Sequence, residues 1–343
     1  MPDSALFRCG AFARLYSRRQ VLIMASCSLL TALLALVALS VGDVPIPLLH
    51  TLRLLVLTDN SAGHFILHEL RLPRVALALL AGGGLGLAGL ILQTLVRNPL
   101  ASPDTLGVTS GASAGALLWL TLFSLRHGSA GMPYAAMGGA ACAVGLIFLL
   151  SARRGLTPLR MILTGVGVSA LAGAVVTLIL VFSPLTTTFS AWVWLSGSVY
   201  AASWPKVLHL LAFYLWALPL LVVLLRYLKA LQLEDALATG LGVRVNAIRL
   251  LLLLACVALS GSAVAQVGAM AFVGLVAPHL ARLVVAQGIF SQAYVATCSG
   301  GSMVVVADLL ARTLFRPADL PAGIFVALAG APLFLWLLIR QRS

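Results

Sequence analysis

Long apolar runs constrain the fold of this 343-residue chain more than any motif does. Runs such as 21–40, 75–96 and 248–267 match the roughly 20 apolar residues that a helix needs to cross a bilayer. Only 9% of the residues are charged, against about a quarter in a soluble domain. The short alternating segments of an outer-membrane barrel are absent from the sequence. The sequence therefore predicts an all-α, polytopic membrane protein, with a single transmembrane domain over residues 1–343.

Hydropathy predicts about ten spans of roughly 20 residues each. They are 21–41, 73–95, 106–125, 134–150, 159–182, 207–227, 247–267, 269–285, 293–311 and 321–339. The first run is longer than a typical signal-peptide core and lacks an obvious cleavage site, so we interpret it as a retained span. The segment 183–204 is rich in Trp and Tyr, which favours a position along the membrane surface.

The basic residues predict the orientation of the chain. A cytoplasmic N-terminus and ten spans place fifteen Lys and Arg residues inside and seven outside, which follows the positive-inside rule and also puts the C-terminus in the cytoplasm. The seven outer residues are Arg53, Arg71, Arg74, Arg126, Lys206, Arg312 and Arg316. The net charge of +13 arises mostly at span ends, without interleaved aromatics, so no nucleic-acid partner is expected.

The second span is unusually rich in small residues. Residues 81–89 read AGGGLGLAG, a composition that would weaken a helix in water. In lipid, small residues let neighbouring helices approach closely. This span is therefore predicted to be central and tightly surrounded.

The chain lacks a visible energy source and a visible active site. No G-x-x-x-x-G-K-[ST] phosphate loop is present in the sequence, and neither lysine follows a glycine. Ion-coupled carriers place ionisable groups near the bilayer midplane, and only Asp308 comes close, near the outer end of its span. No H-E-x-x-H or C-x-x-C motif occurs. We therefore expect no catalysis, metal site or cofactor on this chain, and a separate subunit as the energy source.

A series of short motifs resembles the FecCD-type permeases of bacterial ABC importers for ferric siderophores, haem and cobalamin. In order, the motifs are RLPR at 71–74, Gln93 with RNPLA at 97–101, LG at 106–107, LTGV at 163–166, WLSGS at 194–198, LG at 241–242, FVGLVAPH at 272–279, ADLLAR at 307–312 and LPAG at 320–323. The resemblance implies a multi-pass protein of the bacterial inner membrane. It also implies a second permease, identical or paralogous, two cytoplasmic ATPases that use ATP and Mg²⁺, and a periplasmic substrate-binding protein. The segments 97–109 and 319–323 look closest to the siderophore branch, with haem and cobalamin as alternatives.

The resemblance implies a docking role for Arg71, Arg74 and Arg312, which match arginines that meet acidic residues on the binding protein. A guanidinium is a planar fork that can bind a carboxylate through two hydrogen bonds. The alternative is that Arg71 and Arg74 only anchor a span in the lipid headgroups.

The polar break at 233–242 matches the family's ATPase-coupling segment. Glu234 and Asp235 would suit the start of a short helix, and Gly240, Leu241 and Gly242 its end, because glycine favours the turn that closes a helix. An ordinary solvated loop is the alternative.

Further polar residues are candidates for the substrate pathway. Gln93 and Asn98 lie near the inner half of the second span and either line the pathway or form hydrogen bonds between helices. Thr157 and Pro158 lie where relatives narrow the pore, but Pro158 also suits a plain helix start.

Two other readings of the chain stay open. His64 and His68 are spaced as metal ligands on a helix can be, or they form a surface pair. A stand-alone ion-coupled carrier remains the competing function.

Overall fold

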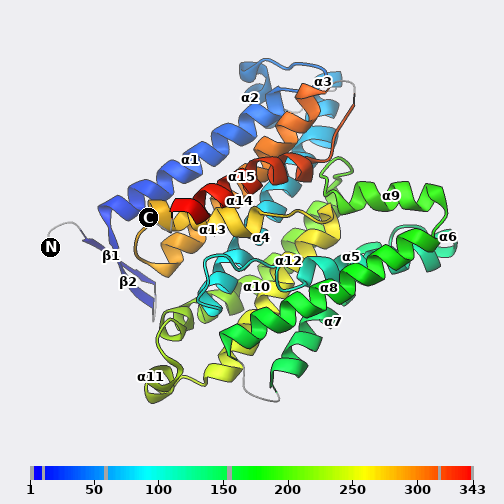
Figure 1. Ribbon diagram of the computed structural model, residues 1–343. Coiled ribbons are helices and arrows are strands. Elements are labelled where there is room, and N and C mark those ends of the chain that lie inside the picture. Colours follow the sequence, from blue (N-terminus) through cyan, green and yellow to red (C-terminus); the bar gives the residue numbers. More distant parts are fainter. Residues whose placement is uncertain (1–3, 10–11, 58–60, 153–156, 316–317, 341–343) are drawn as a thin grey trace.

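The computed structural model describes residues 4–9, 12–57, 61–152, 157–315 and 318–340, and it is helical from Arg18 onward (Figure 1). The helices are α1 Arg18–Ser40, α2 Leu48–Val56, α3 Ala62–Phe65, the π-helix η1 Ile66–Arg71, α4 Leu72–Leu95, α5 Val108–Leu122, α6 Ser124–His127, α7 Met132–Ala152, α8 Pro158–Phe182, α9 Leu185–Leu195, α10 Trp204–Leu231, α11 Asp235–Gly240, α12 Val245–Val267, α13 Val273–Val284, α14 Ile289–Leu314 and α15 Ala322–Arg340. Arg316, which the charge count places outside, falls beyond the described residues.

A two-stranded hairpin precedes α1, and the described chain is otherwise helical, as the all-α expectation has it. Strand β1 (Ser4–Cys9) pairs antiparallel with β2 (Phe12–Ser17). A search for apolar runs of about 20 residues cannot register strands of six. Ser17 then caps α1, since its hydroxyl accepts from the Gln20 amide.

Each of the ten expected spans falls on one helix, but the helices differ in length. Among the described residues, seven helices are long and apolar enough to cross a membrane, and three apolar helices are shorter. The shorter ones are Val108–Leu122, Val273–Val284 and Ala322–Trp336. The expected span at 269–285 starts late because Phe272, at φ 66°, leaves the helical region just before α13.

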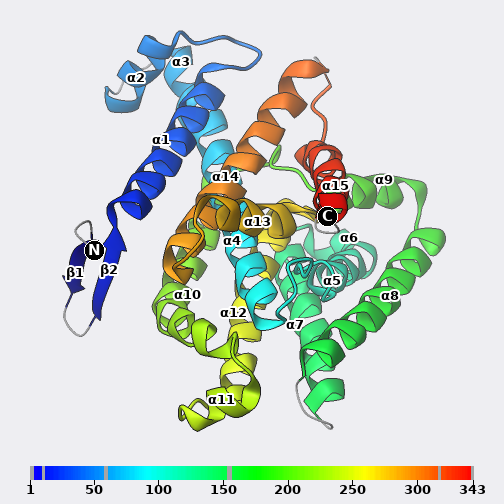
Figure 2. The ribbon, with the colours of Figure 1, turned by 60° about the vertical axis from the view of Figure 1, so that its left-hand side comes forward.

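Helix α4 forms the centre of the bundle, as its glycines predict. In its most apolar stretch of 18 residues, 83% of the residues are buried, against 6% in α1 and 11% in α8. Helices α1 and α8 lie on opposite sides of the molecule (Figure 2). A Cβ atom added at Gly82 or Gly89 would collide with the backbone carbonyl of Gly300 or Gly274. Glycine is therefore required where α4 touches α14 and α13 backbone to backbone.

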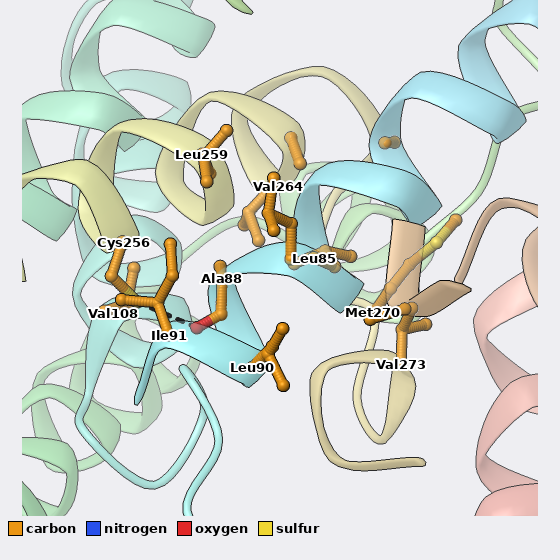
Figure 3. Close-up of a cluster of buried hydrophobic side chains, with 14 of the residues drawn as sticks. Leu85, Ala88, Leu90, Ile91, Val108, Cys256, Leu259, Val264, Met270 and Val273 are labelled. Atoms are coloured by element: carbon orange, nitrogen blue, oxygen red, sulfur yellow. Dashed lines mark hydrogen bonds between the residues drawn. The ribbon is translucent and has the colours of Figure 1, made fainter. Parts of the chain in front are cut away.

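The core lies where α4 meets α12 (Figure 3). Leu85, Leu90 and Ile91 of α4 are at most 1% exposed. The Cys256 thiol of α12 lies 3.6 Å from the carbonyl oxygen of Ala88, which links the two helices by a hydrogen bond. This interface joins the two helices whose ends carry the candidate sites.

Those candidate sites lie at opposite ends of the bundle. Helices α2 and α3 gather with the C-terminal end of α14 at one end, which we call the α3 end (Figure 1). Helix α11 projects from the opposite end, which we call the α11 end. Because α4 begins at the α3 end and finishes toward the α11 end, it connects the two.

Candidate docking and coupling sites

Arg71 is placed at the α3 end by a local π-helix. The amide of Leu72 bonds to the carbonyl of Leu67 five residues back, the π-helical pattern. Arg71 then reaches the C-terminus of α1, where Nη1 donates to the carbonyl oxygens of Leu39 at 2.7 Å and Ser40 at 3.1 Å. It is 6% exposed and satisfies carbonyls that a helix end leaves without an intrahelical partner.

Arg74, one turn later on α4, binds two carboxylates. Its Nε lies 2.9 and 3.0 Å from the two oxygens of Asp308 on α14. Its Nη1 and Nη2 each lie 2.9 Å from an oxygen of Asp319, in the link between α14 and α15. The guanidinium carbon also lies 5.6 Å from the centre of the Tyr200 ring, in the range of a cation–π contact. Arg74 therefore joins three separate segments of the chain.

Arg312 completes the cluster from the far side of Asp308. Its Nη2 donates to the carbonyl of Ala38 at the end of α1, and its Nε lies 3.6 Å from the Asp308 carboxylate. The Asp308 side chain is 3% exposed between the two arginines. A buried carboxylate needs such compensation, since burying an unpaired charge is costly.

The structure brings the three predicted docking arginines together. Arg71, Arg74 and Arg312 all line one cavity of about 500 Å³ at the α3 end, with Asp319 and Tyr200 on its wall. Each arginine makes hydrogen bonds within the chain. Asp319, at 25% exposed, is the more accessible partner of Arg74. The docking role itself stays a prediction.

At the α11 end, the coupling segment folds into a short helix with a defined stop. Helix α11 begins at Asp235, and Glu234 is its N-cap residue without a side-chain capping bond. Gly242 takes φ +82°, and its amide bonds to the carbonyl of Thr239 while that of Val243 bonds to Ala238. This is the Schellman stop that glycine favours at C′. Gly242 thus ends the helix as predicted, whereas Gly240 is its last helical residue.

Asp235 is held by two arginines from other helices. Nη1 and Nη2 of Arg249, on α12, each lie 2.8 Å from one of its oxygens. Nη2 of Arg97, just beyond the end of α4, lies 2.9 Å from Oδ1. The Arg249 guanidinium, with Arg97 beside it, lowers the pKa of the Asp235 carboxyl from its ordinary value. We call these three residues the Asp235 clamp.

The candidate coupling segment exposes three leucines. Leu233, Leu237 and Leu241 recur every four residues and are 42%, 59% and 68% exposed. Leu237 and Leu241 share one face of α11, and Leu233 precedes the helix. Leu241 is the C-cap residue of α11, so the candidate coupling residue carries the most exposed apolar side chain of the three.

The candidate pathway residues lie at two places, the end of α4 and the start of α8. Gln93 is 1% exposed and its Nε2 donates to the carbonyl of Leu275 on α13 at 3.2 Å, a bond between helices. Asn98 instead bonds within its own turn, because its Oδ1 accepts from the Leu100 amide. The Asn98 side chain is short enough to close this Asx turn. Thr157 is the N-cap and Pro158 the first residue of α8.

His64 and His68 stack on each other, with ring centroids 4.2 Å apart. His68 Nε2 lies 2.9 Å from the carbonyl oxygen of Leu54. Among the residues that the structure describes, no group of three or more His, Cys, Asp or Glu is arranged to hold a metal ion.

Sequence reasoning missed the partners of both ionic sites. In the sequence, Asp319 and Arg97 stand only within motifs, and Arg249 is one of the fifteen basic residues counted inside. One signal was present: Arg249 stands one residue into an apolar run, where a charge requires a partner. The partner, Asp235, lies fourteen residues earlier, across a turn between two helices.

Comparison with known proteins is consistent with this architecture. The chain is 50% identical over 342 residues to the achromobactin transport system permease protein CbrC of Dickeya dadantii (strain 3937), covering 100% of this chain and 98% of the relative. It is 38% identical to the Fe(3+) dicitrate transport system permease protein FecD of Escherichia coli (strain K12), covering 90% and 95%.

A solved structure described as an inward-facing conformation of a metal-chelate type ABC transporter matches with a TM-score of 0.83 and 31% identity, over 93% of this chain and 99% of the other. The FecCD transport family matches residues 30–340. On this evidence the chain is a multi-pass membrane protein that belongs to the FecCD transport family.

Proposed function

We propose that this chain is the permease subunit of an ATP-driven ABC importer that moves a ferric siderophore from the periplasm to the cytoplasm. The observation that carries the proposal is 50% identity to an achromobactin permease over the whole chain. A relative that transports ferric dicitrate, another iron chelate, supports the same cargo class. Haem and cobalamin are the alternative cargoes.

The proposed membrane arrangement has ten spans in the bacterial inner membrane, formed by one permease domain over residues 1–343. The seven long apolar helices supply most of them, and α5, α13 and α15 complete the number. The excess of basic residues on one side supports cytoplasmic N- and C-termini. The α3 end then faces the periplasm, and the α11 end faces the cytoplasm.

Energy would come from two cytoplasmic ATPases that use ATP and Mg²⁺. The support is the exposed apolar row of Leu233, Leu237 and Leu241 beside an otherwise polar segment. Exposed apolar side chains grouped on one surface mark interaction sites, and a cleft on an ATPase fits this one. Glu234, Gly240 and Gly242 shape the segment that enters it.

A periplasmic substrate-binding protein would dock at the α3 end. The cavity there holds three arginines, and Arg74 already binds Asp319 through a two-bond fork. A carboxylate of the binding protein would take the place of Asp319, since both present the same acceptor. Arg71 and Arg312 would hold the end of α1 in position beneath the contact.

Transport would proceed by alternating access along the interface with a second permease, identical or paralogous. Gln93 would tie α4 to α13 beside the pathway through its bond to Leu275. Thr157 and Pro158 would narrow the inner end at the start of α8. Membrane lipid surrounds the remaining faces.

Reconstitution tests the proposal. The chain, its second permease and the ATPase are placed in liposomes, with the binding protein and radioactive ferric achromobactin outside and ATP inside. We expect iron uptake that needs ATP, Mg²⁺ and the binding protein. Uptake of haem or cobalamin instead would assign the alternative cargo, and uptake by this chain alone on an ion gradient would overturn the proposal in favour of a secondary carrier.

A further inference from the structure

The Asp235 carboxylate is half-exposed, at 45%, and it binds arginines of the permease itself. Both of its oxygens accept hydrogen bonds from Arg249, and Oδ1 also accepts from Arg97. Arg249 is 1% exposed, so Asp235 is its compensating charge and cannot be given up cheaply. An ATPase approaching α11 therefore meets the exposed Leu237 and Leu241, while Asp235 binds the permease's own helices.

Arg97 connects this carboxylate to the end of the central helix. Its backbone takes φ +54°, a left-handed conformation that non-glycine residues rarely adopt. The amide of Asn98 bonds to the carbonyl of Gln93, which closes α4 with the stop that usually requires glycine. An arginine persists in this conformation only where its surroundings hold it there.

The Arg97 side chain makes such contacts. Its Nε donates to the carbonyl of Leu231 at 2.9 Å, and its Nη2 donates to the carbonyl of Leu233 as well as to Asp235. These acceptors lie at the end of α10 and in the link to α11. One guanidinium therefore gathers the end of α4, the end of α10 and the start of α11.

Helix α4 extends from this clamp to the outer arginine cluster. It runs unbroken from Leu72 to Leu95, with Arg74 near one end and Arg97 just beyond the other. Its glycines press against the backbones of α13 and α14, so it moves with them rather than independently. A displacement of α11 that is transmitted through Arg97 therefore reaches α4 and α14. At the α3 end these two helices carry Arg74 and Asp308.

We propose that Asp235 is a positioning residue that ties the ATPase-docking helix to α4 through Arg97 and to α12 through Arg249. ATPase-driven movement of α11 passes to the spans through this carboxylate. The inference rests on the proposed function, because it assigns to α11 the ATPase contact. A positioning role differs from a docking role in its consequence. When the Asp235 clamp is lost, the ATPase stays bound, and only the coupling between the α11 end and the α3 end is broken.

The experiment uses the whole importer in lipid nanodiscs and measures ATP hydrolysis with and without the periplasmic binding protein. The readout is the stimulation ratio, which reports communication from the α3 end to the ATPase and requires no transported cargo. Asp235→Asn removes the charge, and Arg97→Asn removes the guanidinium while keeping a residue that tolerates the left-handed backbone. Arg244→Asn, at an exposed arginine preceding α12, is the matched control.

We expect Asp235→Asn and Arg97→Asn each to reduce the stimulation ratio by about tenfold, within the range of allosteric couplings. With the ATPase in excess, the amount of ATPase bound should match that of the unsubstituted importer. The double variant should be no worse than the more severe single one, because both break one link. Arg97→Lys, which keeps the charge without the fork, should recover part of the ratio, which a mere folding defect would not produce.

Three results would overturn the inference: an unchanged ratio in either single variant, losses that add in the double variant, or release of the ATPase by Asp235→Asn, which would make Asp235 a docking residue. Failure of the proposed function is distinguishable. In that case the unsubstituted chain would neither retain an ATPase nor respond to a binding protein.

Discussion

Arg74 and Asp319 form a two-bond fork in which each terminal guanidinium nitrogen lies 2.9 Å from a carboxylate oxygen. This is the geometry that a carboxylate from another protein would adopt on the same arginine. Asp319 therefore occupies the position that the proposed docking carboxylate would take, and it comes from the link before α15 rather than from a packed helix. Docking at Arg74 would for this reason be coupled to the position of that link.

Removing the Asp319 charge should strengthen docking. Asp319→Asn weakens the internal fork while leaving Arg74 paired with Asp308, so an incoming carboxylate meets less competition. We expect the binding protein to bind nanodisc-embedded importer several-fold more tightly, by about 1 kcal/mol, a typical value for a partly exposed ion pair, as measured by surface plasmon resonance. Glu69→Gln removes an equal charge from an exposed residue of η1 and should change affinity less. Weaker binding by Asp319→Asn would contradict the competition.

The exposed leucines of the coupling segment should anchor the ATPase. Leu241→Gln replaces a side chain that is 68% exposed, so the stability of the isolated permease should not change measurably. In the complex, we expect the affinity for the ATPase to fall by at least about 2 kcal/mol, the scale of an interface hot spot, as measured by titration of ATPase onto permease nanodiscs. Leu57→Gln, at a leucine that is 52% exposed at the α3 end, is the control. Equal affinities for both variants would exclude Leu241 as an anchor.

The glycines of α4 should be intolerant of any side chain. In Gly89→Ala, the new Cβ would meet the carbonyl of Gly274, so we expect destabilisation of about 1–3 kcal/mol from overpacking. Gly145→Ala, on α7, places its Cβ where no atom lies within 4 Å, and it should be neutral or slightly stabilising because alanine favours helix. Thermal unfolding in detergent compares the two. A Gly89→Ala melting temperature at or above that of the unsubstituted protein would refute the close backbone contact.

The Asp235 clamp should weaken only in strong acid. Because Arg249 and Arg97 lower the pKa of Asp235, its contribution to stability is complete above the ordinary carboxyl pKa of about 3.9. That contribution is lost as the pH falls through the lowered folded-state pKa. Hydrogen-exchange protection of residues 232–244, corrected for intrinsic rates, should therefore stay constant from about pH 7 to pH 5. Asp235→Asn should show lower protection at every pH, and a decline in the unsubstituted protein near neutral pH would contradict the assignment.

The helices and the central position of α4 could be predicted because they depend on local composition. Runs of apolar residues mark where helices lie, and the glycines at 82–84, 86 and 89 indicate which helix is surrounded. The Gly242 stop was also predictable, since glycine favours a left-handed helix end. The hairpin before α1 and the late start of α13 could not be predicted from hydropathy. The hairpin has strands of only six residues, and the start of α13 depends on the backbone conformation of Phe272 alone.

The ionic sites could be predicted only in part. Arg74 pairs with Asp308 and Asp319 across 234 and 245 positions of sequence, and only the packing of α4 against α14 brings them together. Arg71 can be singled out in the sequence because it is a charge at a span end. Its partners are backbone carbonyls of α1, and these cannot be predicted because every residue has a backbone carbonyl. Long-range partners of this kind emerge from the assembled bundle rather than from any one segment.

The glycine contacts of α4 also determine where spectroscopic labels would be informative. Backbones that touch at Gly82 and Gly300, and again at Gly89 and Gly274, leave no room for sliding, so spin labels on α4 and α14 would report one fixed separation throughout the transport cycle. Of the most apolar window of α8, only 11% is buried, so less packing within the chain holds its distance from α4. Label pairs that join α8 to α4 are therefore the ones that would resolve the opening and closing of this protein.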